Sequence, residues 1–382
     1  MTMDSAVNQA VRQALHRAIA EKGEIGIQVA AYLGEELVID CWAGVADRES
    51  GRPVDADTLF NVFSVSKAVV STAVHVQAEK GLVEYDRPIA DYWPEFAQNG
   101  KETITVRDAL NHHTGTPQMP PGTTPESMCD WDFMARGIAG LTPILPRDKP
   151  AYQAMSFGWV LGEVVRRTDS QRRDFGRFVQ EEICEPYGIT DLWIGMPDEA
   201  ERRVATLVDE GSSASFPDDS YFAMALPNNV RLIPDVFERP AVRRAAVAAV
   251  GGIFNARSEA RFWAIWANGG ALDGKRLLSK ERVDAACLPR ANSEAPDPVY
   301  FNAPMPLSQG GFWMYSPTTP LTCPAKGERT ICVPGAGGSL GWADPDTGLA
   351  VAFCHNRMMR PRSCEDHPLY EIADVIRSSL GV

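Results

Sequence analysis

The 382-residue sequence lacks the features that mark several classes of protein. No apolar run is long enough to span a bilayer, and the first residues begin a charged amphipathic stretch instead of a basic segment followed by an apolar one. Basic residues are in the minority, with 37 Lys and Arg against 50 Asp and Glu, so the net charge is −13. This charge repels phosphate backbones and anionic lipids, so we expect neither nucleic acid nor a membrane as a partner.

Disulfide and metal-binding patterns are also missing from the sequence. The eight cysteines are spread along the chain without Cys-x-x-Cys pairs, and the six histidines include no His-Glu-x-x-His motif. A chain of this length does not depend on disulfides to build a core. We therefore predict reduced thiols, a cytoplasmic protein and no metal site.

The composition is that of an ordinary folded protein. Hydrophobic residues make up 45% of the chain and charged residues 23%, with 28 prolines and 31 glycines. These proportions exclude disordered, collagen-like and coiled-coil proteins. The length permits a sizeable core and a division into two lobes.

Both ends of the chain predict the same kinds of element, a helix and a β-hairpin. Apolar residues recur at helical spacing in the terminal segments, and β-rich runs flank short turns that contain glycine. The predicted elements are a helix over residues 4–20, a hairpin of Ile25–Tyr32 and Leu37–Trp42, a hairpin of Leu340–Ala343 and Leu349–Cys354, and a helix over Asp366–Leu380. Strands at both ends predict one antiparallel sheet, assembled from the two ends and covered by helices.

The middle of the chain is rich in helical patterns. These cover Val106–Asn111, Met155–Arg167 and Phe175–Cys184. Residues Asn292–Pro334 carry many Pro, Gly, Ser and Thr residues, which predicts extended loop and short strand. We therefore predict an α+β fold. Residues 1–80 and 240–382 form its sheet lobe, residues 81–239 form an inserted, mostly helical lobe, and the active site lies between the two.

The first candidate for chemistry is a Ser-x-x-Lys motif, Ser64 to Lys67, directly before a helical run that stops at Gly81. A spacing of three puts Ser64 and Lys67 on one face of a helix. A serine hydroxyl becomes a nucleophile when a base takes its proton, and a desolvated lysine of lowered pKa can be that base. The start of a helix also directs N–H groups toward developing negative charge. The motif is short enough to occur by chance, and the alternative is an N-cap serine followed by a solvated lysine.

A competing nucleophile is Ser339 in Gly337-Gly338-Ser339-Leu340-Gly341, which fits the Gly-x-Ser-x-Gly pattern of a nucleophile elbow. An elbow requires a strand, a sharp turn and a helix, whereas a predicted hairpin follows Ser339. The acid and base would have to come from Asp344, Asp346 or Asp366 and from His355 or His367. A hydrolase core does not fit into so short a segment, so the pattern favours a tight glycine-rich bend beside the sheet.

Segments along nearly the whole chain extend the Ser-x-x-Lys motif into an ordered series. They are Thr58–Lys67, Tyr92–Phe96, Val106–Gly115, Ala151–Trp159, Gly251–Ser258 and Gly335–Gly341. This series resembles the serine β-lactamase-like family, in particular its esterase branch, the family VIII carboxylesterases, which is similar to class C β-lactamases. The resemblance implies a β-lactamase/transpeptidase-like fold.

The resemblance also implies a role for individual residues. Ser64 is then the acylated nucleophile, Lys67 its proton acceptor and Tyr152 the phenol that relays protons to the leaving group. The backbone N–H groups of Ser64 and Ala336 form the oxyanion hole. Because a cationic neighbour favours a phenolate, we expect Lys67 to lower the pKa of Tyr152.

Two positions depart from the pattern of this family. The tyrosine motif reads Tyr-Gln-Ala from Tyr152, without the Asn or Ser that β-lactamases usually carry at the third position. The third motif reads Val-Pro-Gly, where a basic residue would bind a substrate carboxylate, and we assign its Val333 and Gly335 to substrate binding. Both departures point away from β-lactam antibiotics and toward less charged acyl substrates.

We therefore predict a serine hydrolase that cleaves carboxylic esters of small molecules through a Ser64 acyl-enzyme, without a cofactor. Two alternatives use the same residues: a β-lactam or amide hydrolase, and an acyltransferase. The remaining alternative is a catalytically inactive binding protein of the same fold. The intact Ser64, Lys67 and Tyr152 argue against that alternative.

Overall fold

A computed structural model describes residues 5–211, 215–316, 324, 327–360, 363–364 and 366–382. Cys323, the first four residues of the predicted amino-terminal stretch and parts of the predicted 292–334 loop lie outside these residues. The helices and strands below are those of the described part of the chain.

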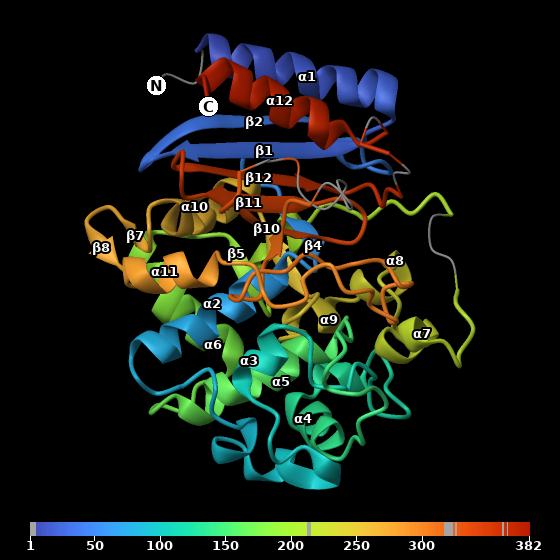
Figure 1. Cartoon of the computed structure of the whole chain (residues 1–382). Coiled ribbons are helices and arrows are strands. Elements are labelled where there is room, and N and C mark those ends of the chain that lie inside the picture. The colour runs from blue at the N-terminus through green and yellow to red at the C-terminus, as the bar shows by residue number, and fades with distance from the viewer. Residues whose placement is uncertain (1–4, 212–214, 317–323, 325–326, 361–362, 365) are drawn as a thin grey trace.

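A seven-stranded antiparallel sheet is built from both ends of the chain, as the sequence predicts (Figure 1). Its order is β3-β2-β1-β12-β11-β10-β9. The strands are β1 (Gly26–Leu33), β2 (Glu36–Asp47), β3 (Arg52–Pro53), β9 (Trp313–Met314), β10 (Ile331–Pro334), β11 (Leu340–Asp344) and β12 (Leu349–His355). The first strand pairs with the last, with Val29 opposite Phe353, so the two predicted hairpins meet in the centre of the sheet.

The two terminal helices cover one face of this sheet, and a third helix covers the other (Figure 1). Helix α1 (Ala6–Lys22) begins at Ser5, whose hydroxyl accepts from the Asn8 N–H, and ends at Gly23 with φ 72°. Helix α12 (Pro368–Leu380) lies beside it. Helix α10 (Ala256–Ala267) packs against β1, β11 and β12 from the opposite side. Both predicted terminal helices are confirmed.

Most of the remaining secondary structure in the described part of the chain is helical. The helices are α2 (Ser66–Glu79), α3 (Val106–Leu110), α4 (Trp131–Ala139), α5 (Ser156–Thr168), α6 (Phe175–Val179), α7 (Tyr221–Ala225), α8 (Pro234–Phe237), α9 (Pro240–Arg244) and α11 (Lys280–Ala286). The predicted helix over Phe175–Cys184 is found, but its second half, Gln180–Cys184, is a π-helix. No helix in the described part of the chain is long and apolar enough to cross a membrane.

A small three-stranded sheet, in the order β4-β6-β5, leads the chain into the turn that carries Ser64. Its strands are β4 (Phe60–Phe63), β5 (Leu192–Ile194) and β6 (Gly252–Phe254), and a further hairpin consists of β7 (Ala271–Leu272) and β8 (Lys275–Arg276). Strand β4 contacts β12 of the large sheet, and α2, which follows β4, packs against α5. The proposed lobe boundaries at residues 80 and 240 remain a prediction.

Candidate active site

Ser64 lies on a strained turn between β4 and α2. Phe63, the last residue of β4, has φ 48°, which is unusual for a bulky residue, and its ring packs edge-on against Phe237 at 5.3 Å. The Ser66 hydroxyl donates to the Phe63 carbonyl at 2.5 Å and accepts from the Gly252 N–H at 2.8 Å. This serine therefore fastens the turn to β6 and holds Ser64 at the start of α2.

Lys67 is buried directly behind Ser64. Its Nζ lies 3.1 Å from the Ser64 Oγ and donates to the carbonyls of Ala154 at 2.7 Å and Ala249 at 3.1 Å. Only 2% of the residue is exposed, and this burial lowers the pKa of Lys67 to about 7. A large share of the lysine is therefore neutral near pH 7 and able to take the serine proton.

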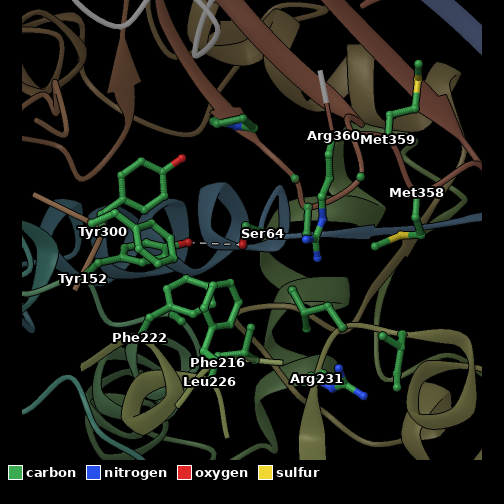
Figure 2. Close-up of a pocket in the computed structure, with 18 of the residues that line it drawn as sticks. Ser64, Tyr152, Phe216, Phe222, Leu226, Arg231, Tyr300, Met358, Met359 and Arg360 are labelled. Carbon is green, nitrogen blue, oxygen red and sulfur yellow. Dashed lines mark hydrogen bonds between the residues drawn. The ribbon is translucent and has the colours of Figure 1, made fainter. Parts of the chain in front are cut away.

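Tyr152 completes a three-residue cluster around the Ser64 hydroxyl. Its phenol oxygen is 3.4 Å from the Ser64 Oγ (Figure 2), and the Lys67 Nζ lies 5.3 Å from the centre of its ring. Burial raises the pKa of Tyr152 well above its ordinary value. The expected lowering by Lys67 is therefore wrong, because desolvation of the buried phenol is the largest influence on this pKa. Tyr152 is a neutral phenol and a proton donor in this state.

His112 holds the backbone on both sides of Tyr152. This role of His112 was not predicted from the sequence. Its carbonyl accepts from the Ala151 N–H at 2.8 Å, and its Nδ1 accepts from the Gln153 N–H at 3.1 Å. The two rings of His112 and Tyr152 meet edge to face at 5.1 Å. Burial holds the pKa of His112 well below its usual range, so the ring is a neutral acceptor. The sequence offered only one indication of this role, because His112 lies at a predicted helix end within Val106–Gly115, one of the segments that resemble the family.

A glycine-rich loop after β10 lies against the Ser64 turn. A Cβ on Gly335 would come within 2.3 Å of the Val62 carbonyl, so only glycine permits this approach. The loop closes through hydrogen bonds from the Gly335 N–H to the Ser339 carbonyl at 2.7 Å and from the Gly338 N–H to the Gly335 carbonyl at 3.1 Å. Ala336 in this loop lines the same cavity as Ser64. Backbone N–H groups beside the nucleophile are the donors that an oxyanion requires.

Ser339 belongs to a buried bend, as predicted. The residue is 2% exposed, and its Oγ accepts from the His355 N–H at 3.3 Å. Strand β11 follows it, whereas an elbow would continue into a helix. The acidic partner of His355 is Glu24, with 2.9 Å between the Glu24 Oε1 and the His355 Nδ1. It is therefore none of the three aspartates considered above for an elbow, Asp344, Asp346 and Asp366.

The cavity over Ser64 has a volume of about 590 Å³ and a mostly apolar lining (Figure 2). The lining residues are Ser64, Tyr152, Ala154, Phe216, Phe222, Leu226, Arg231, Leu232, Ile233, Tyr300, Phe301, Trp313, Pro334, Gly335, Ala336, Gly337, Met358, Met359 and Arg360. The charged side chains among these described residues are both arginines. In Figure 2 the two tyrosines and the Arg360 side chain lie on opposite sides of Ser64.

The structure brings most of the predicted site residues together. Ser64, Tyr152, Gly335 and Ala336 line one cavity, and Lys67 is buried at its base. Val333 is 1% exposed and is not part of the described lining, so its assignment to substrate binding stays a prediction. No group of three His, Cys, Asp or Glu side chains that could hold a metal ion occurs among the residues described.

Comparisons with known proteins agree on one family. Residues 7–374 match the family model described as Beta-lactamase. The chain is 33% identical over 356 residues to the esterase/beta-lactamase LipL of Mycobacterium tuberculosis, which covers 90% of this chain and 79% of that protein. Two solved structures cover 98% of this chain and 99% of their own: a family VIII carboxylesterase (28% identity, TM-score 0.88) and a penicillin-binding protein homologue from Caulobacter crescentus (30% identity, TM-score 0.85). The predicted fold is confirmed.

Proposed function

The chain belongs to the β-lactamase family, and from this premise we propose that it is a serine ester hydrolase acting through an acyl-enzyme on Ser64. The observation that carries the proposal is the Ser64 hydroxyl, which lies 3.1 Å from a buried lysine Nζ and 3.4 Å from a neutral phenol. Relatives named as an esterase/beta-lactamase and a family VIII carboxylesterase support the ester as substrate. An inactive binding protein would not require a serine hydroxyl between a buried lysine and a neutral phenol.

Acylation follows from the positions of the three side chains. Neutral Lys67 accepts the Ser64 proton as Oγ forms a bond to the ester carbonyl carbon. The N–H groups of Ser64 and Ala336 stabilise the oxyanion. When the bond to the alcohol oxygen breaks, the Tyr152 phenol gives that oxygen a proton and regains one from the Lys67 ammonium. Water then attacks the acyl-enzyme by the same proton transfers in reverse.

The proposed role of Lys67 predicts a pH dependence. Below its pKa of about 7 the lysine carries a proton and cannot accept one from Ser64, so kcat/KM for an ester should fall as pH decreases through 7. Above that pKa the lysine is neutral and the rate should reach a plateau. Initial rates between pH 5 and pH 9, corrected for spontaneous hydrolysis, measure this profile. A rate independent of pH from 5 to 9 would exclude Lys67 as the base.

The substrate class is tested with p-nitrophenyl acetate, butyrate and octanoate beside a chromogenic cephalosporin. We expect turnover of the esters with little opening of the lactam, because Ala154 in the cavity offers no polar side chain to an amide. The Ser64→Ala protein is the blank. Efficient lactam opening with slow ester turnover would overturn the ester assignment.

One observation favours β-lactam hydrolysis as a second candidate function. β-Lactam antibiotics carry a carboxylate, and Arg360 brings a guanidinium into the cavity although Val333 replaces the usual basic residue. If lactams are opened, Arg360→Ala should raise their KM about tenfold, the loss of one charge-assisted contact, and leave the KM of the neutral p-nitrophenyl butyrate unchanged. An equal effect on both substrates would show that Arg360 does not recognise the carboxylate.

We also propose that the protein is cytoplasmic. The support is that cysteines occur as free thiols, several of them deep in the core. The buried ones include Cys41, Cys184, Cys287 and Cys354, and the partly exposed ones are Cys129 and Cys364.

A further inference from the structure

A buried carboxylate, Asp297, lies between two segments of the cavity wall. It belongs to the stretch between α11 and β9 and has no exposed surface. Its Oδ2 accepts from the backbone N–H of Tyr152 at 2.9 Å, across a separation of 145 residues. Its Oδ1 accepts from the N–H groups of Val299 at 2.8 Å and Tyr300 at 3.1 Å. One side chain therefore ties the tyrosine segment to the segment that carries Tyr300.

The bond to Asp297 completes the restraint of the Tyr152 backbone. The N–H groups on either side of it, those of Ala151 and Gln153, both donate to His112. Three successive N–H groups are thus fixed by two buried residues, through the carbonyl and ring of His112 and the carboxylate of Asp297. Since the phenol stands only 3.4 Å from the Ser64 Oγ, a rotation of this backbone would move it out of reach of the reacting atoms.

The Oδ1 of Asp297 holds the segment that contributes an aromatic wall to the cavity. The Tyr300 ring meets the Tyr152 ring edge to face at 5.7 Å and the Trp313 ring at 5.7 Å. In Figure 2 the Tyr300 and Tyr152 rings lie together on one side of Ser64. The neighbouring Phe301 contacts Phe222 at 4.8 Å. The carboxylate that holds the phenol also holds the wall beside it.

Burial raises the pKa of Asp297, and the three backbone N–H donors and a nearby guanidinium oppose this rise. The guanidinium of Arg290, a residue 4% exposed, is bound to the carbonyls of Asn111 and Met305 and attracts the carboxylate electrostatically. An ionised carboxylate can accept all three N–H groups, whereas a carboxamide presents two hydrogens of its own at one end. The site therefore distinguishes aspartate from its near-isosteric amide.

We propose that Asp297 is a positioning residue for the reaction, which holds the Tyr152 phenol at the distance from Ser64 needed to protonate the leaving group. The proposal rests on the function proposed above. It assigns Asp297 no contact with substrate, and the effect of Asp297 on protonation of the leaving group is exerted through Tyr152.

The test uses two esters of one acid, p-nitrophenyl butyrate and ethyl butyrate. Both form the same butyryl-enzyme, and kcat/KM reports only steps up to its formation. p-Nitrophenolate departs as a stable anion, whereas ethoxide needs a proton. Asp297→Asn should therefore lower kcat/KM for ethyl butyrate about 10- to 100-fold. The decrease in kcat/KM for p-nitrophenyl butyrate should be about ten times smaller. Tyr152→Phe should change the ratio of the two rates in the same direction, and the double variant should match Tyr152→Phe.

Asp169→Asn is the matched control, because Asp169 is also buried and paired, with Arg173 at 2.8 Å, but does not line the cavity. It should lose thermal stability and keep the wild-type ratio. Asp297→Glu retains the charge but is longer by one methylene, so it should displace the Tyr152 backbone and change the ratio in the same direction if the Asn variant does not fold. An unchanged ratio in the folded Asp297 variants, or a further change of the ratio in the double variant, would overturn the proposal. Equal ratios for Tyr152→Phe and wild type would instead refute the proposed role of Tyr152.

Discussion

Replacing Ser64 by alanine should lower ester turnover by at least about 10⁴-fold, because Ser64 is the hydroxyl among the described lining residues that lies within hydrogen-bond distance of the buried lysine. The change removes one oxygen from a turn that is held by other hydrogen bonds, from the Ser66 hydroxyl to the Phe63 carbonyl and from the Gly252 N–H to the Ser66 hydroxyl. The variant should therefore keep its circular dichroism spectrum and melting temperature close to those of the wild type. Steady-state rates with p-nitrophenyl butyrate measure the loss.

Ser339→Ala is the matched control for this prediction. Ser339 lies in a Gly-x-Ser-x-Gly pattern but is buried, with its hydroxyl on the His355 N–H. We expect kcat within about threefold of the wild type and a stability loss of about 1 kcal/mol, the net value of one hydrogen bond. Loss of turnover in Ser339→Ala with retention in Ser64→Ala would reverse the assignment of the nucleophile.

Replacing Lys67 by methionine should lower kcat/KM for esters about 10³-fold, which is the usual contribution of a general base. Methionine is an unbranched side chain of similar volume, so the helix and its neighbours need not move. The carbonyls of Ala154 and Ala249 would lose their donor, and the Ser64 hydroxyl would lose its base. The remaining activity should no longer fall as pH decreases through 7. A variant that kept the wild-type profile would rule out Lys67 as the titrating group.

A second buried lysine offers the control for Lys67→Met. The Lys101 ammonium donates to the carbonyls of Gln98, Ala139 and Leu141 and is not part of the cavity. Lys101→Met therefore removes the Lys101 hydrogen bonds to three carbonyls. It shows how much the loss of a buried lysine donor lowers stability when the cavity is not affected. We expect a lower melting temperature with an unchanged kcat and pH profile.

Local patterns were sufficient to predict most of the fold. The hairpin of β1 and β2 turns at Gly34 with φ 59°, a conformation that glycine adopts readily, and β-rich runs flank it. Helix α1 has both a serine cap and a glycine stop. The π-helix at Gln180–Cys184 was not foreseen, because helical periodicity does not distinguish the two helix types over one turn.

The site depended on information that local patterns do not contain. The nearness of Ser64 and Lys67 follows from their spacing, but Tyr152 was found only through the family resemblance. The bond from Tyr152 to Asp297 crosses 145 residues, and no local signal marks such a pair. The pKa of Tyr152 was predicted in the wrong direction, since burial is a property of the folded core and not of the neighbouring residue type.

The nucleophile that the acyl-enzyme requires can be identified directly by mass spectrometry. Incubation with a p-nitrophenyl phosphonate ester should release p-nitrophenol and add one phosphonyl group to the intact protein, and peptide mapping should locate that group on Ser64. Ser64→Ala should remain unmodified under the same conditions, and Ser339→Ala should be labelled like the wild type. Labelling of another residue, or of Ser64→Ala to the same extent, would refute the proposal that Ser64 is the nucleophile.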